Sequence, residues 1–288
     1  MAMKFRTAIC PPQYPFHIGY DDPVVLLGSC FSDHIGDFFL RSGFATCSNP
    51  FGTLFNPVSI AQDIDFLLNP ESFDEQWYTQ FDGRWVSFAH YSKFSNTDKD
   101  IFLQHIHNQL SESSKFLHSA HYLFITWGTA YVYRHLERNL TVANCHKMPA
   151  SSFSKSRLTI NNIVETYQSL FERLRKFNED LRIVLTVSPI RHLGDGFHEN
   201  TLSKSVLHLA AEQLVDNDKV FYFPAYEILQ DDLRDYRFYA TDLCHPSPSA
   251  VEYIEELVAQ SFFTDETEAL RRQKEKEYKA LQHRPILK

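Results

Sequence analysis

The chain has 288 residues, and its 28 basic and 36 acidic side chains give a formal net charge of −8. Because no basic stripe or RNA-reading motif occurs, we expect no nucleic-acid partner. The five cysteines are irregularly spaced without a CxxC pair, which argues against a disulfide framework and for a reducing compartment. No apolar run approaches the roughly 18–20 residues of a membrane helix, and the N-terminus lacks the apolar segment of a signal peptide. We therefore expect a cytoplasmic protein without a membrane span.

The first predicted strand covers residues 24–27, which are all apolar, as in a strand buried on both faces. The small residues 28–30, Gly-Ser-Cys, end it abruptly, and a helix is predicted to follow at once. We expect Ser32 to cap this helix and Gly43 to end it. A second helix is predicted over residues 56–68, because proline is favoured at the first helical position and apolar residues recur at helical spacing.

The rest of the chain alternates between strands and helices after a hairpin-like or irregular segment at 77–94. The predicted elements are a helix near 97–117, a strand at 122–126, two paired strands at 130–135 and 141–146, a helix near 159–177, a strand at 182–189, a helix near 200–215, a strand at 219–223, a helical or turn-like segment at 224–235, and helices near 247–262 and 265–282. The last of these interleaves basic and acidic residues, which is typical of a solvated helix face.

This alternation indicates an α/β fold with a largely parallel sheet. We expect one domain over residues 1–263 with hairpin insertions, followed by a polar C-terminal helix or tail over 264–288. Functional groups in such sheets lie beyond the carboxyl ends of the strands. That rule points to four segments, namely residues 28–30, 127–130, 188–191 and 242–245.

Cys30 is the first candidate for chemistry. It follows a strand and stands at or just before the start of a helix, where the helix dipole favours a thiolate. A base within reach would complete its activation as a nucleophile. The alternative is a cysteine that packs as a small hydrophobic side chain.

Asp242 and His245 form a second candidate, in the segment TDLCHPS. Residues three apart in a turn can approach, so the carboxylate can accept from the imidazole Nδ1–H and leave Nε2 free as a base. Pro246 keeps the pair on a loop, because it disfavours helical geometry in the residue before it. The alternative is an exposed histidine beside a helix cap.

The two candidates together resemble the SGNH/GDSL hydrolase superfamily, in which a Gly-Asp-Ser turn follows the first strand and an Asp-x-x-His precedes the last long helix. Further motifs narrow the resemblance to the GSCFA family within it. These motifs are GSCF at 28–31, NPFGTLFNP at 49–57, ITWGTAYVY at 125–133, VANCHKMP at 142–149, TVSPIRH at 186–192, SK at 203–204, YFPAYE at 222–227 and DLRDYRFY at 232–239. The resemblance implies a flavodoxin-like, SGNH-type three-layer sandwich with a mainly parallel central sheet.

The resemblance also implies roles for individual residues. Cys30 takes the nucleophile position, Asp242 and His245 match the orienting acid and the base, and Ser29 replaces the acidic residue of the turn. Ser29 is also the rival nucleophile, although the register with the superfamily favours Cys30.

The oxyanion site of the superfamily is matched only in part. Gly52 resembles the second-block glycine, whose N–H binds the oxyanion, and Gly128 resembles the third-block glycine. Ala130 stands where the third-block asparagine is expected, and Asn144 from the neighbouring hairpin could replace it in space. Arg191, like His192 and Lys204, could bind a carboxylate or sugar hydroxyls of a substrate.

The resulting hypothesis is a hydrolase or acyltransferase that uses a Cys/His/Asp triad and no cofactor on a small-molecule or glycan ester, such as an acylated sugar or a cell-envelope precursor. A non-catalytic glycan- or peptide-binding module on the same fold is the alternative. Cys30, residues 145–146 and residues 244–245 offer cysteine and histidine ligands for zinc, but their spacings are not those of a metal site, so we expect none.

Overall fold

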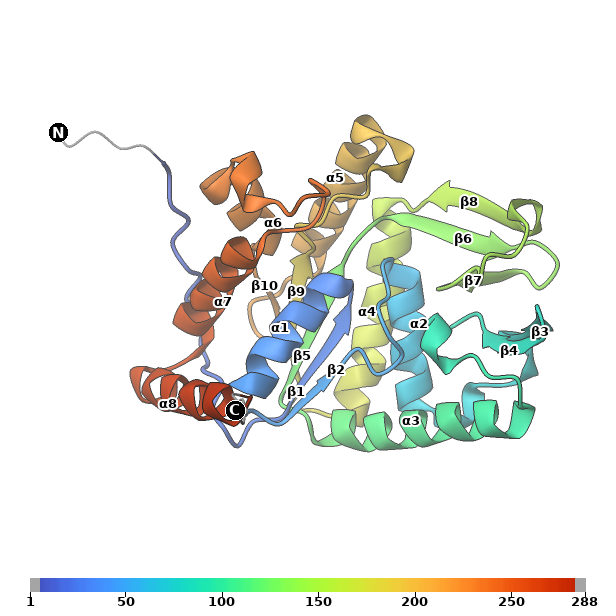
Figure 1. The fold of residues 1–288 in the computed structure, drawn as a ribbon, viewed down its shortest axis with the longest axis horizontal. Coiled ribbons are helices and arrows are strands. Elements are labelled where there is room, and N and C mark those ends of the chain that lie inside the picture. The colour runs from blue at the N-terminus through green and yellow to red at the C-terminus, as the bar shows by residue number, and fades with distance from the viewer. Residues whose placement is uncertain (1–5, 283–288) are drawn as a thin grey trace, which may run out of the picture.

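The computed structural model describes residues 6–282 and has a five-stranded parallel sheet at its centre (Figure 1). All four strand pairs are parallel, and the strand order is β10-β9-β5-β1-β2. The strands are β1 (Val24–Gly28), β2 (Thr46–Ser48), β5 (Tyr122–Trp127), β9 (Arg182–Val187) and β10 (Val220–Tyr222). The predicted α/β fold with a mainly parallel sheet is confirmed.

Helices cover both faces of this sheet, because alternate strand residues point to opposite sides. Val25 and Leu27 lie in one hydrophobic core, with residues of the four helices on that side, whereas Val24 and Leu26 lie in the other. The first face is covered by α2 (Pro57–Leu68), α3 (Lys99–Ser119), α4 (Ile160–Phe177) and α5 (Phe197–Leu214), and the second by α1 (Cys30–Arg41) and α7 (Pro248–Phe262). Within residues 6–282, none of the helices combines the length and apolar character needed to cross a bilayer.

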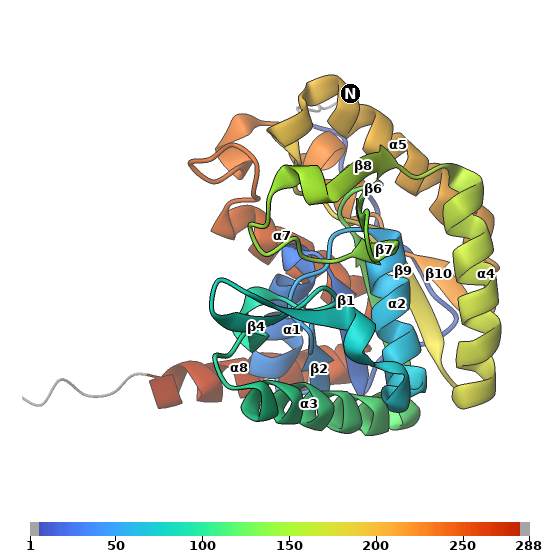
Figure 2. The same ribbon diagram turned by 90° about the vertical axis from the view of Figure 1, so that its right-hand side faces the viewer.

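Two small antiparallel sheets lie on the side of the molecule away from the C-terminal helix (Figure 2). One is the hairpin of β3 (Tyr78–Phe81) and β4 (Arg84–Ser87), and the other has the order β7-β6-β8, formed by β6 (Tyr131–His135), β7 (Leu140–Val142) and β8 (Phe153–Arg157). The sequence prediction missed β8, whose residues are mostly exposed and therefore show no apolar alternation. It also extended β7 too far, because the chain turns away after Val142.

The remaining short helical segments are single turns. They are 3₁₀ turns at Pro70–Ser72, Glu75–Trp77, Ser92–Phe94, Ala150–Ser152, Leu193–Asp195 and Tyr236–Phe238, the α-helical turn α6 (Ala225–Glu227) and a π-helical turn at Ile228–Leu233.

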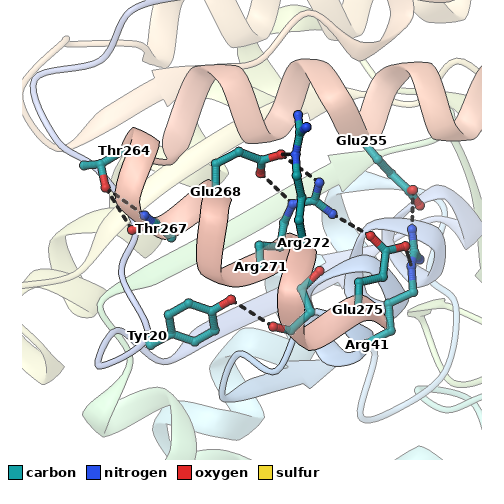
Figure 3. A network of polar contacts seen from close by, with 10 residues as sticks. Tyr20, Arg41, Glu255, Thr264, Thr267, Glu268, Arg271, Arg272 and Glu275 are labelled. Atoms are coloured by element: carbon teal, nitrogen blue, oxygen red, sulfur yellow. Dashed lines mark hydrogen bonds and ion pairs between the residues drawn. The ribbon is translucent and has the colours of Figure 1, made fainter. Parts of the chain in front are cut away.

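The helix α8 (Asp265–Gln282) packs on the second face through a network of ion pairs (Figure 3). Arg41 of α1 pairs with Glu255 of α7 and, at 3.5 Å, with Glu275 of α8. Arg271 is only 8% exposed and pairs with Glu268 at 2.6 Å and with Glu275 at 2.8 Å. The predicted solvated face is therefore wrong for Arg271, because this side chain packs against α1, with its guanidinium 5.2 Å from the Phe38 ring centroid.

The start of α1 also differs from the prediction. Ser29 caps the helix, since its Oγ accepts from the Phe31 N–H at 3.3 Å, and Cys30 is the first helical residue. Ser32, the predicted cap, is fully buried inside the helix. The strand β1 thus passes into α1 without a loop, which places Cys30 directly beyond the carboxyl end of β1.

Candidate active site

Gly28 allows the end of β1 to approach β5 very closely. Its φ is +138°, and a Cβ atom there would lie 2.2 Å from the Thr126 carbonyl oxygen. Its N–H donates to Asn49 Oδ1 at 2.8 Å, and its carbonyl accepts from the Leu54 N–H at 2.8 Å. Only glycine fits this position without strain, and the contacts fix the direction in which the chain enters α1.

The side chains of Cys30, His245 and Asp242 lie in a row beyond the carboxyl end of β1. Cys30 Sγ is 3.7 Å from His245 Nε2, and His245 Nδ1 is 2.6 Å from Asp242 Oδ2. The other carboxylate oxygen of Asp242 accepts the N–H groups of Cys244 at 2.9 Å and of His245 at 3.0 Å. With Nδ1–H donating to the carboxylate, Nε2 is left as a proton acceptor facing the sulfur.

The loop that carries Asp242 and His245 is closed by the main chain. The Ala240 N–H donates to the His245 carbonyl at 2.8 Å, and Leu243 adopts a left-handed φ of +57°. Ser247 then caps α7 through the Ala250 N–H at 3.3 Å. This compact turn fixes the carboxylate and the ring together before the helix begins.

The protein shifts the pKa values of Cys30 and Asp242 in opposite directions. Burial, and then the neighbouring charge of Asp33, raise the pKa of the Cys30 thiol above its ordinary value. The main-chain N–H groups at the helix start lower this pKa, as expected, but desolvation of the sulfur outweighs them. Hydrogen bonds from the main chain of His245 and Cys244, and from the His245 ring, lower the pKa of Asp242 to about 2. The arrangement is a thiol beside a base that an ionised carboxylate orients.

Ser29 differs from Cys30 in its surroundings. It is fully buried, and its Oγ is the acceptor that caps α1. The contact to His245 is made by Cys30. Of the two adjacent candidate nucleophiles, the sulfur is the one that faces the base.

The two glycines proposed for oxyanion binding use their N–H groups within the protein. Gly52 donates to the Asn49 carbonyl at 2.8 Å in a tight turn with a φ of +85°. Gly128 donates to the Phe55 carbonyl at 2.8 Å. The expectation that the Gly52 N–H is available for the oxyanion is wrong, because the N–H groups of both glycines close turns that support the site. The N–H of Cys30 remains, as the first of the helix N–H groups that have no partner within the helix.

Asn144 and Arg191 are held by contacts of their own. Asn144 Nδ2 donates to Ser92 Oγ at 3.1 Å, and its Oδ1 accepts from the His146 N–H at 2.8 Å. Arg191 donates its main-chain N–H to Cys244 at 3.2 Å, and its guanidinium lies 4.4 Å from the Tyr239 ring centroid. Arg191 thus adjoins the loop of the base, whereas Asn144 is fixed in its own loop.

Lys204 is a buried side chain that holds the chain segments after β5 and β9 together. This side chain of α5 is only 2% exposed, and its ammonium donates to the carbonyls of Gly128 and Ser188, each at 2.7 Å. Burial lowers its pKa to about 7. It therefore ties together the carboxyl ends of β5 and β9. Its place on the apolar stripe of α5, three residues before Leu207, was the signal in the sequence that it is buried.

A groove of about 790 Å³ adjoins His245 on the side of α7 and α8. Its lining is mostly charged and includes Arg41, Glu255, Arg271 and Glu275. Within residues 6–282, no group of three or more His, Cys, Asp or Glu side chains is arranged to hold a metal ion.

The fold and the site define an α/β protein in which a cysteine, a histidine and an aspartate are in contact at the carboxyl end of a parallel sheet. The chain belongs to the GSCFA family, whose sequence pattern matches residues 23–257. No curated protein matches it.

Among solved structures, a carbohydrate esterase family 3 protein from Talaromyces cellulolyticus is 8% identical with a TM-score of 0.40, over 83% of this chain and 95% of that one. A family two carbohydrate esterase from Clostridium thermocellum, in complex with cellohexaose, is 11% identical with a TM-score of 0.43, over 84% of this chain and 64% of that one. An acetyl xylan esterase from the rumen bacterium Butyrivibrio proteoclasticus is 9% identical with a TM-score of 0.39, over 84% and 64%. What those proteins act on is a property of their own sites.

Proposed function

We propose that this chain is an enzyme that transfers the acyl group of an ester to water or to another acceptor. Cys30 is the nucleophile, His245 is the base, and Asp242 orients the imidazole. The observation that supports this proposal is the row of contacts from Cys30 Sγ to His245 Nε2 at 3.7 Å and from His245 Nδ1 to Asp242 Oδ2 at 2.6 Å. A thiol hydrogen-bonded to an oriented imidazole is the geometry of nucleophilic catalysis.

The proposed reaction has two steps. As the sulfur of Cys30 attacks the ester carbonyl carbon, His245 Nε2 takes the thiol proton and the carbonyl oxygen becomes negative. When the tetrahedral intermediate collapses, the imidazolium returns that proton to the leaving alcohol, and a thioester remains on Cys30. His245 then takes a proton from water or an acceptor hydroxyl, which attacks the thioester, and the proton returns to the sulfur.

We further propose a sugar ester, such as an acylated sugar or a cell-envelope precursor, as the substrate class that the family resemblance suggests. The groove beside His245 is the proposed place for the alcohol part, since it opens next to the base that must protonate the leaving oxygen. Its ionic side chains offer hydrogen-bond partners to hydroxyl groups.

The proposal is tested with short acyl p-nitrophenyl esters and acyl thioesters, following release of product and the mass of the intact protein. We expect turnover and a transient acyl adduct on Cys30 in the wild type, and loss of both in Cys30→Ala. Cys145→Ala is the matched control, because Cys145 is another half-buried thiol whose pKa burial raises. Turnover that survives in Cys30→Ala but disappears in Ser29→Ala would transfer the nucleophile role to the serine. Saturable binding of glycans or peptides without any turnover would favour a binding module instead.

A further inference from the structure

The proposed acyl transfer requires hydrogen-bond donors directed at the carbonyl oxygen that becomes negative. The N–H groups of Gly52 and Gly128 are used within the protein, and Ala130 has no polar side chain. The N–H of Cys30 is thus left as a single main-chain donor among the residues that the family resemblance suggests. Tetrahedral intermediates are commonly held by more than one donor, so a further donor is expected close to Cys30.

His192 lies close to Gly128 and Ser29, at the carboxyl ends of β5 and β1. A Cβ atom built on Gly128 would lie 3.1 Å from His192 Nε2 and 3.4 Å from the Cβ of Ser29. The imidazole nitrogen and the residue directly before Cys30 therefore border the same point of the β5 carboxyl end. The Phe55 carbonyl oxygen is also only 3.0 Å from this Cβ position, so a side chain on residue 128 would crowd all three groups.

His192 Nε2, the nitrogen that borders this point, has no hydrogen-bond partner among the described residues. His192 Nε2 is buried, and none of the residues 6–282 forms a hydrogen bond with it. A buried polar atom without a hydrogen-bond partner is unfavourable, and such atoms are rare unless they serve a ligand, water or catalysis. His192 thus presents unused hydrogen-bonding capacity close to Ser29, the residue that precedes the proposed nucleophile.

The ring is also fixed in position and uncharged. The His192 main-chain N–H donates to Asn200 Oδ1 at 2.9 Å, and the ring packs edge-on against Phe55 with the centroids 5.6 Å apart. Burial, followed by the charge of Lys204, lowers the pKa of His192 to about 4. At neutral pH the imidazole is neutral, with one N–H donor and one acceptor nitrogen.

We propose that His192 is a catalytic residue that donates a hydrogen bond from Nε2–H to the oxyanion of the tetrahedral intermediate, together with the N–H of Cys30. This inference rests on the proposed acyl transfer. It assigns to an imidazole from the loop after β9 the role that an asparagine after β5 has in the superfamily pattern. The donor is neutral and its ring is held by its neighbours, but Nε2 is buried, so substrate binding must bring the oxyanion into contact with it.

The experiment compares two reactions of Cys30 in the same variants. S-acylation by p-nitrophenyl acetate creates an oxyanion, whereas S-alkylation by iodoacetamide is a displacement that creates none. In His192→Phe, which keeps a planar ring but removes the donor, we expect acylation to slow by about 10²- to 10³-fold and alkylation to stay within about twofold. His192→Asn and His192→Gln carry an amide donor, and at least one of them is expected to recover part of the acylation rate.

His208→Phe is the matched control. His208 lies on α5, and its Nε2 is likewise buried without a hydrogen-bond partner in the part of the chain that the structure describes. Burial lowers its pKa to about 4, but it lies beside Tyr222. We expect both reactions to proceed normally in this variant. Unchanged acylation in His192→Phe would overturn the proposal, and an equal loss of acylation and alkylation would show a structural role instead. Absence of any acyl adduct on Cys30 in the wild type would overturn the proposed function, and this inference with it, which is a result distinct from the other two.

Discussion

The carboxylate of Asp242 holds both the side chain and the main chain of His245. One carboxylate oxygen accepts from Nδ1 of the ring at 2.6 Å, and the other accepts from the main-chain N–H of the same residue at 3.0 Å. The pair therefore folds as a local unit in which the orientation of the ring follows from the turn. Its contact with the sulfur of Cys30 requires in addition that α1 and the loop before α7 meet.

Replacing Asp242 by asparagine tests this orientation. An amide that turns its NH₂ towards the ring cannot accept from Nδ1–H, so His245 would adopt the other tautomer and lose its proton acceptor on the side of Cys30. We expect the turnover number for esters to fall by about 10⁴-fold, with the far-ultraviolet circular dichroism unchanged. Asp231→Asn is the control, since Asp231 is an exposed carboxylate that lies 4.0 Å from Arg234. Activity within a factor of two of the wild type in Asp242→Asn would contradict the orienting role.

Replacing Gly28 by alanine tests the close approach of β1 and β5. The added Cβ would meet the Thr126 carbonyl oxygen at 2.2 Å on a residue with a φ of +138°, so the backbone must move. We expect the free energy of unfolding to fall by more than about 2 kcal/mol, measured by urea denaturation. Gly194→Ala is the matched control, since no heavy atom lies within 4 Å of a Cβ there. Equal stability of the two variants would show that the junction before Cys30 is not constrained.

Lys204 predicts a pH dependence of stability. Burial lowers its pKa from 10.5 to about 7, so between these values the unfolded chain holds a proton that the folded chain has lost. The free energy of unfolding therefore gains a contribution that rises with pH from about 7, by at most about 1.4 kcal/mol per pH unit. Below pH 7 both states hold the proton, and the cost of burying the charge is fully present.

The measurement is urea denaturation of the wild type and of Lys204→Met from pH 6 to pH 9. Other groups titrate in this range, but they are shared by both proteins and cancel in the difference. We expect the stability of the wild type relative to the variant to increase above pH 7. A difference that does not change with pH would mean that Lys204 keeps its proton in the folded protein throughout this range.

The anchoring of α8 depends on Arg41. Its guanidinium pairs with Glu255, whose side chain is 7% exposed, and with Glu275. In Arg41→Met the carboxylate of Glu255 is left buried without its partner, and we expect a loss of about 3 kcal/mol in the free energy of unfolding. Arg272→Met is the control, since Arg272 also pairs with a glutamate but is 70% exposed, and exposed pairs contribute about 0–1 kcal/mol. Limited proteolysis should release α8 faster in Arg41→Met only, and similar losses in both variants would contradict the anchoring role.

The sequence alone was sufficient for those features that depend on neighbouring residues. The apolar run of β1 and the approximate starts of α2 at Pro57 and of α4 at Ile160 follow from proline placement and from apolar periodicity. The contact between Asp242 and His245 is of the same kind, because three residues in one turn are enough to form it. The order of strands and helices likewise indicated the parallel sheet, since short buried strands alternate with helices.

Other features were decided only by the tertiary structure. The 3.7 Å contact joins Cys30 to a residue 215 positions away, the N–H of Gly52 is used in its own turn, and Lys204 and His192 come to lie beneath the sheet edge. The rise in the pKa of Cys30 also arises there, because desolvation depends on what packs around the sulfur. Local sequence determines which hydrogen bonds a turn can make, whereas burial and long-range contacts depend on how the helices pack on the sheet, and the chemistry of this edge depends on both.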